Sequence, residues 1–129
     1  MDISQARLVA LVAVGGAIGS VLRYGVTGVL TTRDFPWGTF VVNFTGTFLL
    51  ALLFFAFLQG GSLPPGLRTF LFIGIFGGYT TFSTFGLETI SLYAEGQPLL
   101  AGANILLNAG LCLVGAYLGR AAGLAVGIR

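Results

Sequence analysis

The sequence contains no lysine and no histidine, and its single cysteine is Cys112. One cysteine excludes an intrachain disulfide, and without histidine the Cys/His sets that hold metals are absent. Charge is also scarce, because 8% of the 129 residues are charged, whereas a soluble domain carries roughly a quarter. So little charge cannot cover a water-facing surface, and we expect no enzymatic activity. A net charge of +2 is also too small for a nucleic-acid-binding surface.

Hydrophobic residues make up 56% of the chain, and they form four apolar segments separated by short connections. We expect membrane-spanning helices over residues 8–30, 39–58, 69–93 and 99–118. Each has about the ~20 residues that a helix needs to cross the hydrocarbon, and none shows the alternation typical of a β-barrel strand. The sequence therefore predicts an all-α, multi-pass protein of the cell membrane, with residues 1–129 as a single four-span domain surrounded by lipid.

The arginines give little preference for one orientation of these spans. Four spans place both termini on one side, together with Arg7, Arg68, Arg120 and Arg129, while Arg33 lies opposite. The positive-inside rule takes this as a mild bias, which permits insertion in both orientations. Four helices also pack too tightly to enclose a water-filled route, so we expect any pathway to lie between two copies of the chain.

Glycines recur at four-residue spacing in the first and last spans. Gly15 and Gly19 share one face of the first, and Gly115, Gly119 and Gly123 share one face of the last. Small residues at this spacing let membrane helices approach closely. We expect these faces to be sites of helix packing.

Polar residues interrupt the first two spans. Arg23 is either an arginine that extends its charge to the membrane interface or an inward cation in a water-filled vestibule, because an arginine within a span costs several kcal/mol without such an outlet. Asn43 lies in the second span with Thr39 and Thr47 one turn away on either side, and Gly46 nearby. Its amide either bonds a neighbouring helix or donates to a passing anion.

The third span contains the string GGYTTFSTF at residues 77–85. Glycine disfavours a helix, and threonine and serine compete for backbone hydrogen bonds. Irregular backbone at membrane depth is tolerated only where it is buried in protein or lines a wet cavity. We expect a helix broken near residues 77–83, with free carbonyls for a hard cation such as Na⁺ and a positive helix end beyond the break. A mildly distorted continuous helix is the alternative.

Beyond this string, Phe82, Phe85 and Glu88 follow at three-residue spacing. The two phenylalanines are either ordinary packing residues or rings whose positive edges face an anion. Glu88 is the only carboxylate within a predicted span, and it is either a buried hydrogen-bonded acid or a coupling group. Because threonine, serine, asparagine and arginine can all donate hydrogen bonds while acids are nearly absent, the composition favours an anion pathway.

The fourth span places Asn104, Asn108 and Cys112 on one row with four-residue spacing. This row predicts a polar seam that faces the bundle rather than lipid. The amides either bond neighbouring helices or line a pathway, and Cys112 is expected to be a buried thiol that packs as a small apolar residue.

Three segments resemble the signatures of the Fluc-type (CrcB-like) fluoride channels: GGAIGSVLRY at 15–24, WGTFVVNFTGTFLLAL at 37–52 and GIFGGYTTFSTFGLE at 74–88. The resemblance implies a passive channel that exports fluoride from the cytoplasm. It also implies an antiparallel, dual-topology homodimer with two fluoride pathways and a central structural Na⁺. The first three spans carry the resemblance strongly, and the fourth carries it loosely.

By position, Phe82 and Phe85 match the family's phenylalanine pair, Asn43 its pathway asparagine and Arg23 its vestibule arginine. The polar residues Thr39, Ser83, Thr84 and Glu88 fall where the family has pathway groups. The family's Na⁺ is held by backbone carbonyls that correspond to Gly77 and Thr80. The family tends to use serine, threonine or tyrosine on the fourth-span row, where this chain has asparagines and Cys112. The amide of Asn108 is expected to replace a hydroxyl in the pathway.

Two other functions fit four spans. A small dual-topology multidrug exporter needs a buried acid in its first span to exchange protons for cationic drugs, but this first span holds Arg23 and no carboxylate. A non-conducting assembly subunit would copurify with a partner and carry no flux, but it gives the broken third span no purpose.

Overall fold

The computed structural model describes residues 2–60 and 63–127, in which every regular element is helical. The elements are α1 (Ile3–Leu30), α2 (Trp37–Gly60), α3 (Pro65–Arg68), the π-helical segment η1 (Thr69–Ile75), α4 (Phe76–Tyr79), α5 (Phe82–Ala94), α6 (Pro98–Ile105), the π-helical segment η2 (Leu106–Leu111) and α7 (Cys112–Val126).

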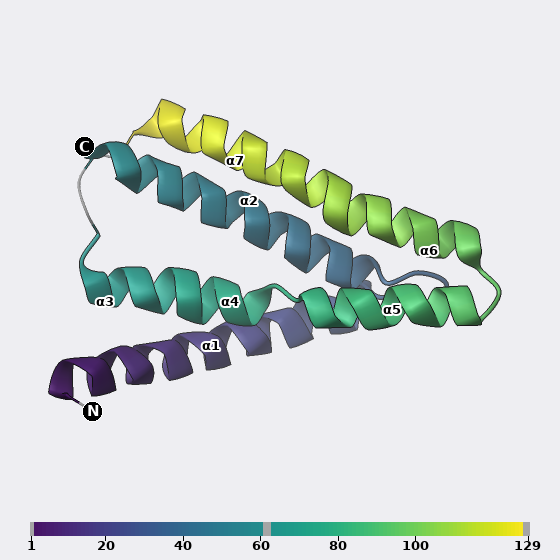
Figure 1. Ribbon diagram of the computed structural model, residues 1–129, viewed down its shortest axis with the longest axis horizontal. Coiled ribbons are helices and arrows are strands. Elements are labelled where there is room, and N and C mark those ends of the chain that lie inside the picture. Colours follow the sequence, from purple (N-terminus) through teal and green to yellow (C-terminus); the bar gives the residue numbers. More distant parts are fainter. Residues whose placement is uncertain (1, 61–62, 128–129) are drawn as a thin grey trace.

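Within these residues, four stretches are long and apolar enough to cross a membrane: Ser4–Leu30, Trp37–Phe57, Pro65–Ala94 and Pro98–Val126. The all-helical, four-span architecture is thereby confirmed. The third stretch consists of α3, η1 and α4, a short extended link, and α5. The described ends of the chain lie at the same end of the bundle (Figure 1).

The third and fourth membrane-spanning stretches begin at proline, and the fourth extends beyond residue 118. Pro65 and Pro98 start their helices because proline fits the first turn, where no intrahelical acceptor is needed. The last helix continues to Val126 and ends at Gly127, which has the left-handed φ of 40°. Arg120 lies within this helix, and its guanidinium is 5.3 Å from the centroid of the Phe55 ring.

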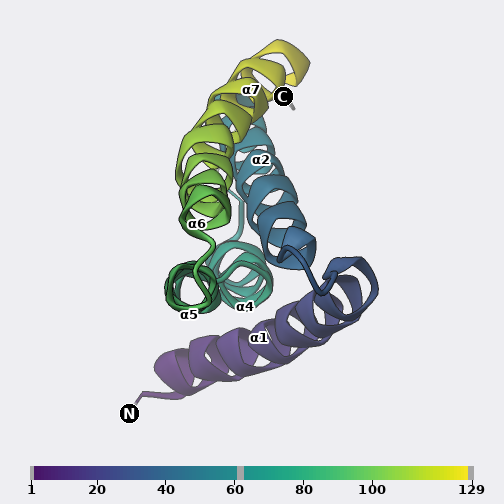
Figure 2. The same cartoon turned by 90° about the vertical axis from the view of Figure 1, so that its right-hand side faces the viewer.

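The bundle consists of two packed pairs of helices, and glycine lets each pair approach closely. Figure 2 shows α2 lying along α7 on one side, and α1 crossing below α4 and α5 on the other. A Cβ on Gly15 would lie 2.6 Å from the Phe70 carbonyl oxygen in η1, and one on Gly115 would lie 3.0 Å from the Phe44 ring in α2. Both glycine rows are therefore packing faces, as predicted.

Candidate functional site

The third span is interrupted at Thr80 and Thr81, within the predicted range 77–83. Both residues are extended, with φ/ψ of −82°/156° at Thr80 and −151°/120° at Thr81. A new helix begins at Phe82 because Thr81 caps it: the Thr81 hydroxyl oxygen accepts a hydrogen bond of 3.2 Å from the Thr84 N–H. The local sequence thus ends one helix and starts the next.

Asn43, from α2, holds this link in place. Its Oδ1 accepts from the Thr81 N–H at 2.8 Å, and its Nδ2 donates to the Thr81 carbonyl at 2.9 Å. The same Nδ2 donates its other proton to Asn108 Oδ1 at 2.8 Å. Both amide protons are engaged within the chain, so the geometry fits the interhelical-bond interpretation of Asn43.

The same bonds release the carbonyls of Gly77 and Thr80. In a continuous helix the Gly77 carbonyl would accept from the Thr81 N–H, and the Thr80 carbonyl would accept from the Thr84 N–H. The Thr81 N–H goes to Asn43 and the Thr84 N–H to the Thr81 hydroxyl. The two residues predicted to hold a cation are therefore among those at the break whose usual intrahelical donors are diverted.

The fourth span supports the break through a ladder of buried amides. Asn108 Nδ2 donates to Asn104 Oδ1 at 2.9 Å, and Asn104 Nδ2 donates to the Thr89 hydroxyl at 2.9 Å. The Thr89 hydroxyl in turn donates to the Phe85 carbonyl at 2.8 Å. Asn104, Asn108 and Cys112 are all buried, so this row faces the bundle as predicted.

A first hollow of about 390 Å³ opens on the α1 side of the break. Its lining includes four predicted residues, which are Arg23, Thr39, Thr84 and Glu88. The Thr39 hydroxyl donates to Glu88 Oε1 at 2.7 Å. Glu88 Oε2 is buried and has no hydrogen-bond partner among residues 2–60 and 63–127, so Glu88 presents an unsatisfied oxygen at this site.

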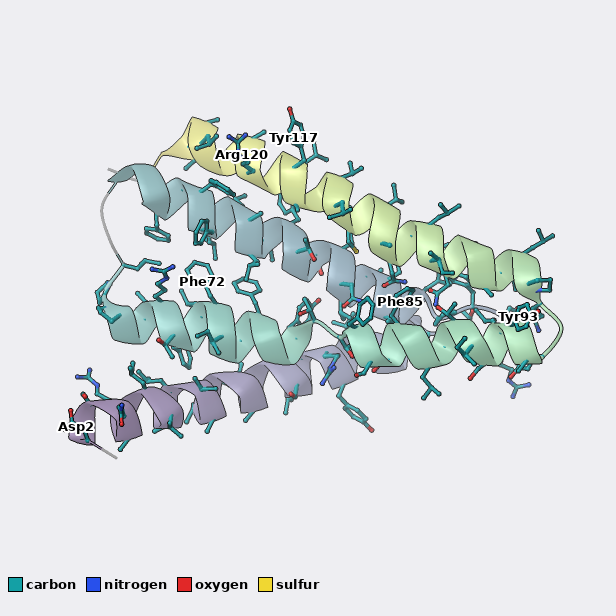
Figure 3. The ribbon with its side chains drawn as sticks, viewed as in Figure 1. Asp2, Phe72, Phe85, Tyr93, Tyr117 and Arg120 are labelled. Carbon is teal, nitrogen blue, oxygen red and sulfur yellow. The ribbon has the colours of Figure 1, made fainter. Side chains whose placement is uncertain are left out.

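A second hollow of about 200 Å³ lies on the α7 side, and its lining includes Asn43, Phe82, Phe85, Asn108 and Cys112. The two rings meet edge to face, with centroids 5.3 Å apart and planes at 66°. Figure 3 shows Phe85 pointing from α5 into the interior of the bundle. Phe85 is 8% exposed, whereas Phe82 is 81% exposed in the single chain. The two rings therefore differ in burial, which their sequence spacing does not show: Phe85 belongs to the core and Phe82 faces outward.

Thr81 lines both hollows, and sequence reasoning left it out of the candidate site. Its place in the TTFST string was the available signal. Sequence reasoning also missed Ser20, Tyr24 and Thr27, which line the first hollow. Ser83 is exposed, and its hydroxyl lies 3.3 Å from that of Thr81.

These features define a class: a small four-span membrane protein whose broken third span lies between two hollows, each lined in part by polar side chains. The chain belongs to the CrcB-like family, since the family model described as "CrcB-like protein, Camphor Resistance (CrcB)" matches residues 10–120. The resemblance inferred from the sequence is confirmed.

Among curated relatives, a protein named "Fluoride-specific ion channel FluC" from Rhodospirillum rubrum is 44% identical over 115 residues, covering 84% of this chain and 88% of that protein. Proteins of the same name from Magnetococcus marinus and Geobacter sulfurreducens are 44% and 45% identical. They cover 89% and 84% of this chain, and 96% and 90% of their own lengths. These relatives are channels, so the chain is a multi-pass protein of the cell membrane and not an enzyme.

Proposed function

We propose that the chain is a passive, fluoride-selective channel that exports fluoride from the cytoplasm. The relatives named as fluoride-specific channels support this. The observation that carries the proposal within the chain is the break at Thr80 and Thr81, which lies between a hydroxyl-rich hollow and one lined by a phenylalanine pair. Fluoride holds its water tightly, so a selective route must replace that water in stages.

The two hollows offer those stages in order. Arg23 is half-buried in the first hollow, where its charge raises the local concentration of anions. The hydroxyl of Thr84 in this hollow, and that of Ser83 next to Thr81, then replace water as donors. Thr39 lines the same hollow, and its proton is engaged by Glu88. The positive edges of the Phe82 and Phe85 rings line the narrowest part of the route and face the ion there without binding it tightly. Binding at each stage stays weak enough for exit.

Two asparagines act mainly as supports for this route. The amide protons of Asn43 are engaged by Thr81 and Asn108, and those of Asn108 by Asn104. We therefore assign Asn43 and Asn108 the task of fixing the Thr81 wall and the second hollow. Glu88 is a partly buried acid that accepts from Thr39, and its buried Oε2 has no hydrogen-bond partner among the described residues; it shapes the entry to the route.

The pathway requires two copies of the chain arranged antiparallel. Phe82 is 81% exposed and Gly77 is also exposed, so residues on either side of the break lie uncovered at the surface of the single chain. A second copy against this face encloses two routes. The small number of arginines gives only a mild bias between the two ends, which permits both orientations. Labelling of single cysteines at the helix ends tests this: equal labelling from both sides supports dual topology, and labelling from one side contradicts it.

A sodium ion fits between two such copies. Hard cations prefer oxygen ligands, and the Gly77 and Thr80 carbonyls of each copy are released from their usual donors. Sodium there would join the two breaks and neutralise four carbonyl dipoles. Replacing sodium with choline during purification should dissociate or destabilise the dimer. A dimer of unchanged thermal stability in choline contradicts this assignment.

The function itself is tested with purified protein in liposomes loaded with fluoride. Efflux is followed with a fluoride electrode, and chloride efflux is measured in parallel on matched vesicles. We expect fluoride efflux well above that of protein-free vesicles and no comparable chloride efflux. Absence of fluoride efflux, or equal chloride efflux, contradicts the proposal. Proton-driven transport of cationic drugs would instead support a multidrug exporter.

A further inference from the structure

A groove far from the break lies between the start of α1 and residues 64–70. Its volume is about 670 Å³, within the roughly 300–1,000 Å³ of pockets that hold small molecules. The lining is largely apolar, with Leu8, Leu11, Leu67 and Phe70 among its residues. Arg7 supplies the charge among the residues that line it. The groove is therefore amphipathic, with a cation beside an apolar channel.

Arg7 differs from the other described arginines at this end of the bundle. The guanidinium of Arg68 lies 5.9 Å from the centroid of the Phe54 ring, and that of Arg120 lies 5.3 Å from that of Phe55. Within residues 2–60 and 63–127, Arg7 forms neither an ion pair nor a ring contact. The nearby Ser4 hydroxyl donates to the Asp2 carboxylate at 2.7 Å. Arg7 is thus an exposed donor that the chain itself leaves available.

The position of Arg7 in the membrane indicates what it meets. The first span begins at Ser4, so Arg7 lies in the opening turns of a membrane helix, where arginine side chains extend to the headgroup level. Guanidinium groups bind phosphate through two parallel hydrogen bonds. The apolar part of the groove begins one residue later, at Leu8, and continues along α1 at Leu11.

We propose that this groove binds an anionic glycerophospholipid, with its phosphate on Arg7 and an acyl chain along Leu8, Leu11 and Phe70. Charge decides the lipid class. A zwitterionic lipid brings a cationic headgroup close to Arg7, whereas an anionic lipid does not. A second copy of the chain is a poorer occupant, because its apolar surface would bury Arg7 without an anion. The proposal needs only the membrane location of the chain, not its ion selectivity.

The test measures association of spin-labelled phosphatidylglycerol and spin-labelled phosphatidylcholine with the reconstituted protein. Wild type should prefer phosphatidylglycerol, and Arg7→Gln should lower that preference about fivefold, the effect of one arginine at an anionic surface. Arg7→Lys should largely retain it. The matched control is Arg33→Gln, in the exposed connection between α1 and α2, and it should behave as wild type.

A second variant tests the apolar part of the groove. A Cβ on Gly66 would lie 3.2 Å from Leu11 Cδ1, so Gly66→Leu fills the groove and should weaken association of both lipids. Fluoride efflux should be unchanged in all variants, which shows that they fold and assemble. Equal association of the two lipids with wild type, or a preference that survives in Arg7→Gln, overturns the proposal. A groove filled by a second copy would give the first of these results.

Discussion

Replacing Asn43 with leucine is the sharpest perturbation of the break. Leucine keeps a side chain that branches at Cγ in α2 but removes three hydrogen bonds of 2.8, 2.9 and 2.8 Å. Two of them hold the N–H and carbonyl of Thr81, and the third holds Asn108. Because Thr81 has extended backbone, no helical neighbour replaces Asn43 as its partner.

The expected cost follows from these three bonds. Interhelical hydrogen bonds in membranes are worth about 0.6 kcal/mol each, which gives roughly 2 kcal/mol for three. A buried group left without a partner costs about 1–3 kcal/mol more, which brings the expected loss to roughly 3–5 kcal/mol. We expect Asn43→Leu to lower the thermal stability of the purified protein and to abolish fluoride efflux, because the wall shared by the two hollows loses its support.

A graded series separates support from simple polarity. Asn43→Asp keeps an acceptor for the Thr81 N–H but places oxygen against the Thr81 carbonyl, so it should also be impaired. Ser91→Ala, at an exposed position of α5, is the control and should be neutral. A double-mutant cycle with Asn108→Leu should give a coupling energy of about 0.6–1.7 kcal/mol. If Asn43→Leu retains wild-type efflux and stability, the assigned role of Asn43 is wrong.

Three further predictions concern the walls of the two hollows. Phe82→Ile and Phe85→Ile should each lower fluoride efflux while the dimer persists on size-exclusion chromatography. Loss of the edge-to-face pair should lower the free energy of unfolding by about 0.5–1.5 kcal/mol. Unchanged efflux would refute the aromatic role. Gly46→Ala would bring a Cβ to 2.5 Å from Thr80 Cγ2, so we expect a loss of about 1–3 kcal/mol in stability and reduced efflux, whereas Gly102→Ala, which has open space, should be tolerated. Thr39→Val removes the hydroxyl that donates to the Glu88 carboxylate. We expect a stability loss of about 1–3 kcal/mol and slower efflux, and Thr39→Ser should restore both. Equal behaviour of the valine and serine variants would contradict the role of this bond.

The break was predictable from sequence because its causes are local. The glycines at 77 and 78 and the threonines at 80 and 81 disfavour a continuous helix whatever surrounds them. The glycine rows were predictable for a similar reason: spacing alone places Gly15 with Gly19 on one helix face. Packing against specific partners then followed from the fold.

The hydrogen-bond connections were not predictable, because they depend on how the helices are rotated against one another. Asn43 and Thr81 are 38 residues apart, and the local sequence around either residue does not indicate that the other is its partner. The three-residue spacing of Phe82 and Phe85 indicated a shared face, yet Phe82 begins a helix at the surface while Phe85 lies one turn further in, against the fourth span. Thr81 was missed because its role as a cap requires the break to be in place.

The central claim is that fluoride passes through this chain passively and in preference to chloride. The most direct measurement is the reversal potential of the current through the reconstituted protein in a planar bilayer, with mixtures of sodium fluoride and sodium chloride that set opposite fluoride and chloride gradients across the membrane. We predict a reversal potential close to the value set by the fluoride gradient and independent of a pH gradient. A reversal potential that follows chloride, sodium or protons would contradict the account.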